Sequence, residues 1–506
     1  MSETTTSSNK RIARNTIMLY IRMLLSIVVS LYTSRVVLTV LGVEDYGIYG
    51  VVGGVVSMFT FLNASMSGAT SRFLTYEMGT GNMEKLKDTF SSALLVHIII
   101  ALLIFILAET VGLWFLIHKL VVPEDRMFAA HIVYQLSILS AMVSITQVPY
   151  NATIIAHEKM DVYAYVELLN VFLKLAIVFL LPILGNDKLI VYAILVFFVS
   201  VLIVFIYRYY CIKHYTESRF QFVYKKEIIK PMLSFSGWDL YGNMAVGWRY
   251  QGMAFLLNMF FGPVLNAASS ISTTVQSIIL GLCDNVSMAF RPQIIKCYAG
   301  YQYNRMNELL ALSVKFTLSM FLLVSIPAFI EIDYVLSLWL GQIPEYSPIF
   351  FRIIIIANIW AVVNRILNIP IHATGRIKQL SFITGSLFLL SLVPMYIGLK
   401  FNFPPTSIYF WMAVFNFLIL VTNFIILKHT LRQVRISPMI KELTTSLVIT
   451  LLVYTLVVSV RDYIDKPFLR LLSSIFLSIL SYGFLFISFQ MKKTERLALY
   501  HKVFKR

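Results

Sequence analysis

The chain has 506 residues, of which 58% are apolar and 13% charged, and its mean hydropathy is +0.78. A soluble domain carries roughly a quarter charged residues, so this composition excludes an ordinary soluble enzyme. Apolar stretches of roughly 20 residues, enough to cross the hydrocarbon core of a bilayer, follow one another almost without interruption. The sequence therefore predicts an all-α polytopic membrane protein.

About fourteen membrane helices are predicted, joined by connections that are mostly too short to form independent domains. In chain order they are expected at 15–41, 46–74, 88–117, 127–155, 160–184, 188–210, 233–261, 264–291, 306–333, 346–373, 377–400, 404–428, 438–461 and 466–491. The longest connection, 211–232, is basic.

The net charge of +17 could suggest nucleic acid, but the basic residues favour alternate connections. With the residues that flank the helix ends included, the N-terminus, the even-numbered connections and the C-terminal tail hold 28 of the 42 Lys and Arg, and the odd-numbered connections hold 7. By the positive-inside rule, both termini are expected in the cytoplasm. Membrane lipids are therefore the expected partner of this charge, and no nucleic acid is expected.

An internal repeat near 220 residues supports the least apolar of the predicted helices, 264–291. The matched features are Gly42 with Gly262, Arg72 with Arg291, Gly79 with Gly300, Pro123 with Pro344, and Pro149 with Pro370. An offset of six helices keeps the same orientation in both copies. It therefore predicts two parallel six-helix lobes with a substrate path between them.

The repeat divides the chain into six predicted parts. These are a cytoplasmic N-terminal segment (1–14), a first lobe (15–210), a cytoplasmic inter-lobe connection (211–232), a second lobe (233–428), two further helices (429–491) and a basic cytoplasmic tail (492–506).

Three short motifs near the N-terminus resemble a known family. The segment 10–16 (KRIARNT) leads directly into the first helix, 41–49 (LGVEDYGIY) is similar to the family's LG-x-x-x-YG-x-Y turn, and 67–73 (SGATSRF) is similar to its G-x-x-R. With two six-helix lobes and two extra C-terminal helices, the chain resembles the polysaccharide-transporter, or O-antigen flippase, branch of the multidrug/oligosaccharidyl-lipid/polysaccharide (MOP) exporter superfamily, whose fold is MATE-like.

The resemblance implies a function. Members of that branch flip undecaprenyl-pyrophosphate-linked oligosaccharide, such as an O-antigen or capsule unit, from the inner to the outer leaflet of the bacterial inner membrane. It implies the lipid-linked oligosaccharide as substrate, and a polymerase and other glycan-assembly proteins as partners. The drug-exporting branch shares the fold, so a cation-coupled multidrug exporter is the alternative.

No catalytic motif is found in the sequence. There is no P-loop, and His157-Glu158 lacks the second histidine of HExxH. A polyprenyl-linked glycosyltransferase or polymerase is the less favoured alternative, because the longest predicted outer connection, around 334–345, is too short for a catalytic site. We expect no enzymatic activity, no metal and no cofactor.

Cations outnumber acids within the predicted helices. A cation at the bilayer centre costs about 2.5–3.5 kcal/mol on insertion scales, so the surplus favours a polar lumen that attracts a pyrophosphate group, with Arg supplying forked donors. The cations are Arg22, Arg35, Lys174, Arg249, Lys315, Arg352 and Arg365, and the acids are Glu109, Glu167, Asp239 and Asp284.

Arg249 is the first candidate for substrate binding because it lies near the middle of the predicted helix 233–261. Gly242, Ala245 and Gly252 lie on its helical face and are expected to leave room around the guanidinium. The alternative is an interhelical ion pair with an acid such as Asp284.

Arg22 and Arg365 are the other candidates. Arg22 shares a helical face with Asn15, Ser26 and Thr33, which predicts a polar stripe suited to a lumen wall. Snorkelling to the cytoplasmic surface is the alternative for Arg22. Arg365 lies closer to its helix end and has two asparagines nearby.

Two acids are candidates for ion coupling. Glu109 and Asp239 are expected at membrane depth, where a carboxylate can exchange a proton or Na⁺. The favoured alternative is a pairing with one of the interior cations.

Lys174 is expected in a local network with Glu167.

Glycines recur at five-residue intervals in the predicted helix 233–261, at Gly237, Gly242, Gly247 and Gly252. This spacing does not follow one helical face. It therefore predicts capacity to bend rather than a packing seam.

Overall fold

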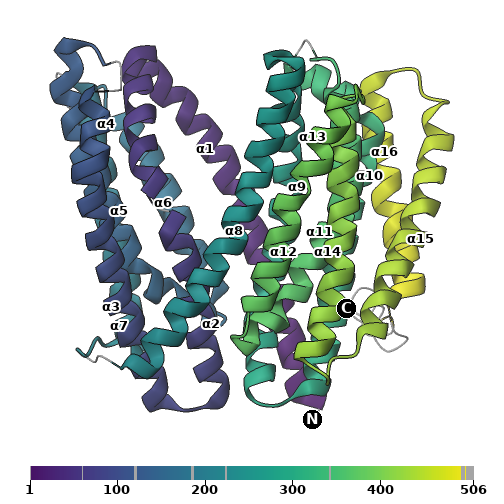
Figure 1. The fold of residues 1–506 in the computed structure, drawn as a ribbon, viewed down its shortest axis with the longest axis horizontal. Helices are drawn as coiled ribbons and strands as arrows, with labels where there is room; N and C mark the ends of the chain where they lie inside the picture. The colour runs from purple at the N-terminus through teal and green to yellow at the C-terminus, as the bar shows by residue number, and fades with distance from the viewer. Residues whose placement is uncertain are drawn as a thin grey trace, which may run out of the picture. The chain divides into compact units, whose positions relative to one another are not determined.

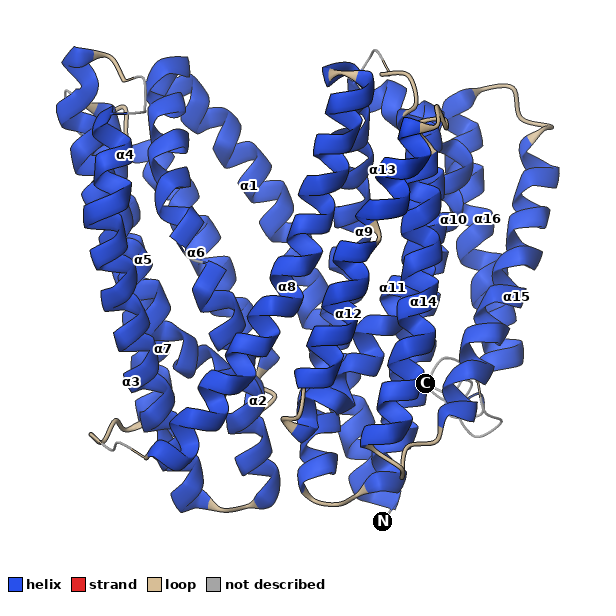
Figure 2. Ribbon diagram, in the orientation of Figure 1, coloured by secondary structure: helices blue, strands red, loops and turns tan. Residues whose placement is uncertain are grey.

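The computed structural model describes residues 2–59, 61–118, 122–183, 187–222, 225–340, 343–491 and 496. Within these ranges the regular structure is helical throughout and contains no strand (Figure 2). Each predicted membrane helix has a counterpart, so the all-α polytopic architecture is confirmed. The chain divides into two compact units, unit 1 (1–240) and unit 2 (241–506).

Unit 1 contains the elements from α1 to the first part of α8 (Figure 1). They are α1 (Ser2–Phe59), α2 (Phe61–Thr80), α3 (Met83–Leu107), the π-helical η1 (Ala108–Gly112), α4 (Leu113–His118), η2 (Glu124–Arg126), α5 (Met127–Ala156), α6 (Met160–Leu180), α7 (Lys188–His214), η3 (Thr216–Ser218) and the start of α8 (Lys226–Phe261).

Unit 2 contains the rest of α8 and the elements that follow it. They are α9 (Pro263–Ala299), α10 (Tyr303–Leu340), α11 (Ser347–Thr374), α12 (Lys378–Leu390), α13 (Leu392–Lys400), α14 (Ser407–Thr430), α15 (Ile436–Arg461), α16 (Pro467–Leu485) and the π-helical η4 (Phe486–Gln490).

The predicted break between the first two helices lies at Gly42, inside α1. Its backbone has φ 83° and ψ 168°, a region that is open essentially to glycine alone. Gly262, between α8 and α9, has φ 80° and ψ −174°. These two glycines are the first matched pair of the internal repeat, so the same backbone conformation recurs where the repeat requires it.

Eleven stretches of the described residues are long and apolar enough to cross a membrane. Neither α8 nor α9 is among them, although both are helical along their whole length. Polar residues lower the hydropathy of α9, which was the reason to infer this helix from the repeat. The chain is a multi-pass membrane protein.

Each unit buries one side of its helices and leaves an apolar outer side. In unit 1, Phe90 of α3, Tyr150 of α5 and Tyr207 of α7 belong to one buried cluster. In unit 2, Phe350 of α11 and Tyr409 of α14 pack together with ring centroids 4.8 Å apart. Large apolar side chains remain exposed along most helices, as expected where the surrounding solvent is hydrocarbon.

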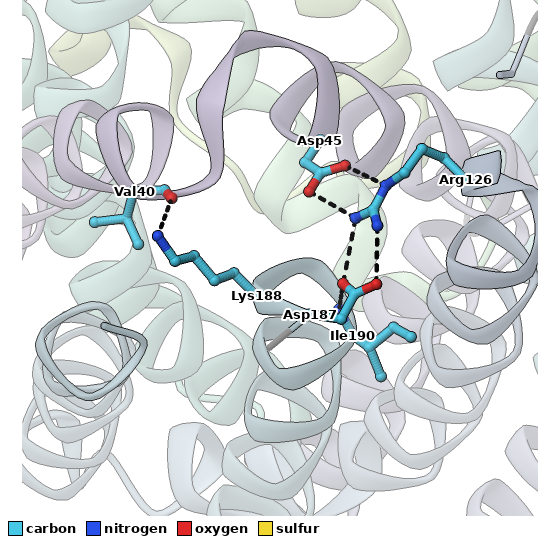
Figure 3. A network of polar contacts seen from close by, with 6 residues as sticks. All are labelled: Val40, Asp45, Arg126, Asp187, Lys188 and Ile190. Carbon is cyan, nitrogen blue, oxygen red and sulfur yellow. Dashed lines mark hydrogen bonds and ion pairs between the residues drawn. The ribbon is translucent and has the colours of Figure 1, made fainter. Parts of the chain in front are cut away.

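Arg126, in the short η2, joins three parts of unit 1 (Figure 3). Its guanidinium donates to Asp45 from Nε (2.8 Å) and Nη2 (2.6 Å), and to Asp187 from Nη1 (2.9 Å) and Nη2 (3.2 Å). Asp45 lies just after the Gly42 break in α1, and Asp187 is the N-cap of α7. This Arg126 strut therefore ties α1 and α7 to the start of α5.

The strut changes the titration of Asp187, whose pKa lies below its usual value. Burial by itself raises the pKa, but hydrogen bonds from Arg126 and from the Ile190 backbone amide, together with the Arg126 charge, lower it further than burial raises it. A carboxyl group with a lowered pKa stabilises the folded state above its ordinary pKa, here 3.8. That contribution is lost as the pH falls from this value through the folded-state pKa.

Helices α15 and α16 lie next to each other at the end of unit 2 and pack against α10 (Figure 1). Glu331 of α10 is only 1% exposed. Its Oε1 lies 2.9 Å from Arg461 Nε at the end of α15, and its Oε2 accepts a hydrogen bond of 3.1 Å from Arg470 Nε of α16. Ser474 Oγ donates to Oε1 at 3.3 Å. One buried carboxylate thus joins α10 to both C-terminal helices.

A second set of polar contacts joins the same helices through η4. Lys315 of α10 is buried and its Nζ donates to the Gln490 carbonyl oxygen at 2.8 Å. The Gln490 side chain accepts from Ser319 Oγ at 3.2 Å and donates to Ser446 Oγ of α15 at 2.7 Å. The two helices outside the repeat are therefore fixed to unit 2 by polar contacts at two places.

The Arg126 strut leads to a prediction about acid stability. Arg126→Gln should lower the free energy of unfolding by about 1–2 kcal/mol at neutral pH, because charge-assisted hydrogen bonds to two partly exposed carboxylates are lost. The wild type should lose stability as the pH falls below 3.8, and the variant should lose less. Unfolding of the detergent-solubilised protein at several pH values measures both effects.

The control for this variant is Arg14→Gln, which removes an exposed ion pair with Asp161 (3.0 Å) and should change stability by less than about 1 kcal/mol. Equal effects of the two variants, or an unchanged acid profile in Arg126→Gln, would contradict a stabilising strut.

The carboxylate of Glu331 leads to a second prediction. Glu331→Gln should lower the free energy of unfolding by about 3 kcal/mol, because two cations lose a buried partner. Asp333→Asn is the matched control, since Asp333 pairs with Arg352 at 2.5 Å but is 58% exposed, and its loss should cost at most about 1 kcal/mol. The midpoint of thermal unfolding measures both, and a smaller loss in Glu331→Gln than in the control would refute the assignment.

Candidate functional site

The polar residues of α9 form an exposed stripe on unit 2. Ser270, Thr274, Ser277 and Asp284 are all exposed, and their spacing of four, three and seven residues follows one face of a helix. Exposed polar and charged groups within a membrane helix face water or protein rather than lipid. The α9 stripe is therefore a surface of unit 2 that faces water or protein rather than lipid.

Asp284 on this stripe pairs with Arg365 of α11 through an ion pair between Oδ1 and Nη1. The side chains are 55% and 45% exposed. An ion pair in contact with water contributes only about 0–1 kcal/mol, so it separates readily. The acid considered as the partner of Arg249 thus pairs with Arg365 instead.

Arg249 of α8 lies inside unit 2 and is 3% exposed. Its Nη1 donates to the Asn416 Oδ1 of α14 at 2.7 Å, and its Cζ lies 4.5 Å from the Phe388 ring centroid and 5.3 Å from that of Tyr250. Among the described residues no carboxylate lies within ion-pair distance of it, and its Nε is buried without a hydrogen-bond partner. The guanidinium is held by a neutral amide and by aromatic rings.

A set of asparagines orients this amide. Asn416 Nδ2 donates to the Ala357 carbonyl oxygen at 3.1 Å, which turns Oδ1 toward Arg249. Asn364 Nδ2 donates to the Asn416 carbonyl oxygen at 3.2 Å, and Asn423 Nδ2 donates to Asn364 Oδ1 at 3.1 Å. The residue after Asn364 is Arg365, so α11 links the surroundings of both arginines.

This asparagine network was missed in the sequence, although a signal was present. Asn416 and Asn423 are seven residues apart, and Asn364 and Asn368 are four apart, so each pair lies on one helical face. Amides repeated at this spacing in apolar helices indicate a polar contact between helices. Glu331 was likewise not considered among the interior acids.

Two of the four glycines predicted to let α8 bend lie at contacts with neighbouring helices. A Cβ on Gly252 would lie 2.7 Å from a Leu392 methyl carbon, and one on Gly242 would lie 3.6 Å from Ser381 Oγ. These glycines allow close packing of α8 against α12 and α13, so they do not leave room around Arg249. Gly237 and Gly247 have nothing within 4 Å of an added Cβ.

Arg22 lies in unit 1, with its Cζ 5.2 Å from the Tyr163 ring centroid of α6. Asn15, on the same predicted stripe, is buried and its Nδ2 donates to the Glu158 carbonyl oxygen at 3.0 Å. Thr33 donates to its own helix, to the Val29 carbonyl oxygen. Much of the stripe is therefore used in contacts within unit 1 rather than in an exposed wall.

Glu167 and Lys174 do not pair with each other in the structure. Glu167 Oε1 accepts a hydrogen bond of 3.1 Å from Tyr207 of α7. Of the other interior cations, Lys174 is half-buried, and the side chain of Arg35 lies outside the described residues. The Glu167 charge nevertheless acts on Lys174, so the two residues share a local environment, as expected.

Glu109 lies in the π-helical η1 of unit 1, an element type that is frequent at functional sites. Its Oε2 accepts from Gln135 Nε2 of α5 at 3.3 Å, while Oε1 is buried without a hydrogen-bond partner. No described cation pairs with it. The other candidate acid is Asp239 of α8, which lies beside Gly68 of α2. A Cβ added to Gly68 would be 3.7 Å from Asp239 Oδ2.

A cavity of about 320 Å³ in unit 2 lies apart from these charges. Residues of α10, α11 and α15 line it, among them Ile326, Ile355 and Leu451, and none of its lining residues is charged. An apolar cavity of this kind suits hydrocarbon rather than a charged head group.

The comparisons with known proteins agree with this arrangement. The model of the family described as "Polysaccharide biosynthesis protein" matches residues 9–333. No curated protein sequence matches the chain.

Among solved structures, a multidrug resistance MATE family transporter of the MOP superfamily in an outward-facing conformation is similar with a TM-score of 0.72 at 14% identity, over 84% of this chain and 96% of that one. A MATE in a bent conformation gives a TM-score of 0.73 at 13% identity, over 86% and 97%. A MOP superfamily transporter from Pyrococcus furiosus, with a binding pocket of reversed polarity, has a TM-score of 0.70 at 13% identity, over 84% of this chain and 96% of that one.

The family model covers more than half of the chain, and the structural similarities cover most of it at identities that establish the fold alone. The resemblance inferred from residues 10–80 is thereby confirmed. The chain belongs to the polysaccharide biosynthesis protein family, and its fold is that of the transporters of the MOP superfamily.

Proposed function

We propose that the protein is a flippase that moves undecaprenyl-pyrophosphate-linked oligosaccharide, such as an O-antigen or capsule unit, from the inner to the outer leaflet by alternating access. The membership of the chain in the polysaccharide biosynthesis protein family supports the choice of substrate class. The function requires no catalytic residue and no cofactor from this chain.

Arg249 is the observation that carries the proposal. The guanidinium of Arg249 is buried and held by Asn416 and aromatic rings, and no carboxylate of the described residues lies within ion-pair distance of it. Its positive charge within the hydrocarbon layer is therefore not balanced by an opposite charge. Such a charge attracts a multiply charged anion more strongly than it would in water. A pyrophosphate group has the charge and the oxygen geometry that Arg binds best.

The same charge argues against the multidrug exporter. An exporter of cationic amphipathic drugs is expected to have an acidic or apolar path, because a buried cation repels its substrates. Glu109, an interior carboxylate without a described cation partner, is the observation that favours this alternative. In the flippase, Glu109 and Asp239 are the candidates for coupling transport to a proton or Na⁺.

The substrate-binding residues that we propose are Arg249, Arg365 and Arg22. Arg249 attracts and binds the pyrophosphate from unit 2, where Phe388 covers it in this conformation, and Arg365 contributes from the water-facing side of α11. Arg22 contributes from α1 of unit 1. Movement of Phe388 away from Arg249 is a required step of transport in this scheme.

The proposed setting follows the charge of the connections. The excess of Lys and Arg in alternate connections supports a cytoplasmic location of both termini, and the membrane that we propose is the bacterial inner membrane. The partners are the lipid-linked oligosaccharide, membrane lipids, and the polymerase and other proteins of glycan assembly.

A reconstituted transport assay tests the function. The purified protein is placed in vesicles that carry undecaprenyl-pyrophosphate-linked oligosaccharide, and translocation is followed by the access of a membrane-impermeant glycosidase. Arg249→Gln should slow translocation by about ten- to a hundredfold, since a hydrogen bond to a charged group contributes about 1.5–3 kcal/mol. Arg249→Lys should retain part of the activity because the charge remains.

Arg352→Gln is the matched control, because it removes another helical cation of unit 2 whose partner is the exposed Asp333. It should transport at the wild-type rate. Normal translocation by Arg249→Gln would overturn the role proposed for Arg249. Efflux of cationic dyes without any translocation of glycolipid by the wild type would overturn the proposed function and favour the drug exporter.

A further inference from the structure

We propose that Asp284 is a built-in counter-anion of Arg365. Asp284 pairs with the Arg365 guanidinium when no substrate is bound, and this competition makes Arg365 selective for multiply charged phosphate groups. The inference rests on the proposed function for the identity of the transported lipid. It adds a specificity-determining residue to the site. Its ligand chemistry is a pyrophosphate, free or esterified to a lipid.

Position supports this role. Asp284 lies in the second half of α9, at the end of the exposed polar stripe of Ser270, Thr274 and Ser277, and Arg365 faces it from α11. Both side chains are about half exposed, at 55% and 45%. The pair is therefore reachable from water, unlike the buried Arg249.

The contrast with Arg249 shows what a carboxylate changes. Arg249 is held by the neutral Asn416 and keeps an unbalanced charge, whereas Arg365 is neutralised by Asp284. Two arginines of unit 2 are thus held in two electrostatic states. A uniformly cationic wall would bind any small anion, and a neutralised Arg365 does not.

Competition between anions explains the selectivity. Asp284 presents one negative charge, while a pyrophosphate presents several charges and can make two parallel hydrogen bonds to one guanidinium. Because an ion pair in contact with water is weak, pyrophosphate displaces Asp284 from Arg365, and chloride does not. When the substrate leaves, Asp284 closes on Arg365 again and opposes rebinding.

Calorimetric titration of the purified full-length protein tests this inference with inorganic pyrophosphate as the probe. Asp284→Asn should bind pyrophosphate about three- to tenfold more tightly than the wild type, because the competing carboxylate is gone. Chloride should weaken pyrophosphate binding more in this variant than in the wild type. Asp284→Glu is the control that keeps the charge, and it should behave as the wild type.

A double variant shows whether the effect passes through Arg365. In the Arg365→Gln background, Asp284→Asn should give no gain in affinity. A gain of the same size in that background, or an unchanged or weaker affinity in Asp284→Asn, would refute the counter-anion role. Asp284→Ser, which is also uncharged, replaces Asp284→Asn if the latter does not fold, with the unfolding midpoint as the check.

A second arm with undecaprenyl pyrophosphate in mixed micelles distinguishes a lipid head group from free pyrophosphate. A larger gain for the lipid indicates that the site serves the lipid-linked substrate, and equal gains indicate recognition of the phosphates alone, both consistent with the role of Asp284. The failure of the proposed function is separate. If the protein does not translocate glycolipid but Asp284→Asn still binds pyrophosphate more tightly than the wild type, the flippase assignment fails and the counter-anion role of Asp284 is retained.

Discussion

A charged side chain within or at the edge of a hydrocarbon layer requires a partner or water, and this requirement organises the molecule. In unit 1, the Arg126 strut satisfies two carboxylates with one guanidinium, next to the glycine break that begins the second helix. In unit 2, Glu331 does the reverse and satisfies two guanidinium groups with one carboxylate. Each group joins helices that are distant in the sequence, so the satisfied charges also define which helices move together.

Against that background, charges without an opposite charge are informative. Arg249 has an amide where Arg352 and Arg365 have carboxylates, and the asparagine network of α11 and α14 fixes the orientation of that amide. Glu109 is the counterpart in unit 1, a carboxylate in a π-helical turn held by Gln135. Burying Arg249 and Glu109 without an opposite charge costs free energy, and folding alone does not require that cost. The substrate and coupling proposals therefore rest on these two residues.

The interior arginines also differ in access to water. Arg249 is covered by Phe388, and Arg365 is half exposed with Asp284 beside it. In the scheme that we propose, an anion binds in stages, first at Arg365, where a weak ion pair can be exchanged, and then at Arg249, where Phe388 must move. Helix α8 packs against α12 at Gly242 and against α13 at Gly252, where no side chain of α8 separates the helices. Arg249 lies between these two glycines in the sequence and is buried.

The sequence by itself determined the membrane class, the fourteen-helix pattern and the family, because hydropathy, loop charge and glycine motifs are local properties of the chain. The repeat even indicated α9, and Gly42 and Gly262 have the same backbone conformation. Only the tertiary structure decided the partners of the charges. Asp284 pairs with Arg365 and not Arg249, and Lys315 binds a carbonyl oxygen of η4. Helical spacing gives the face on which a side chain lies, but the helix opposite that face is set by packing among all the helices of a unit.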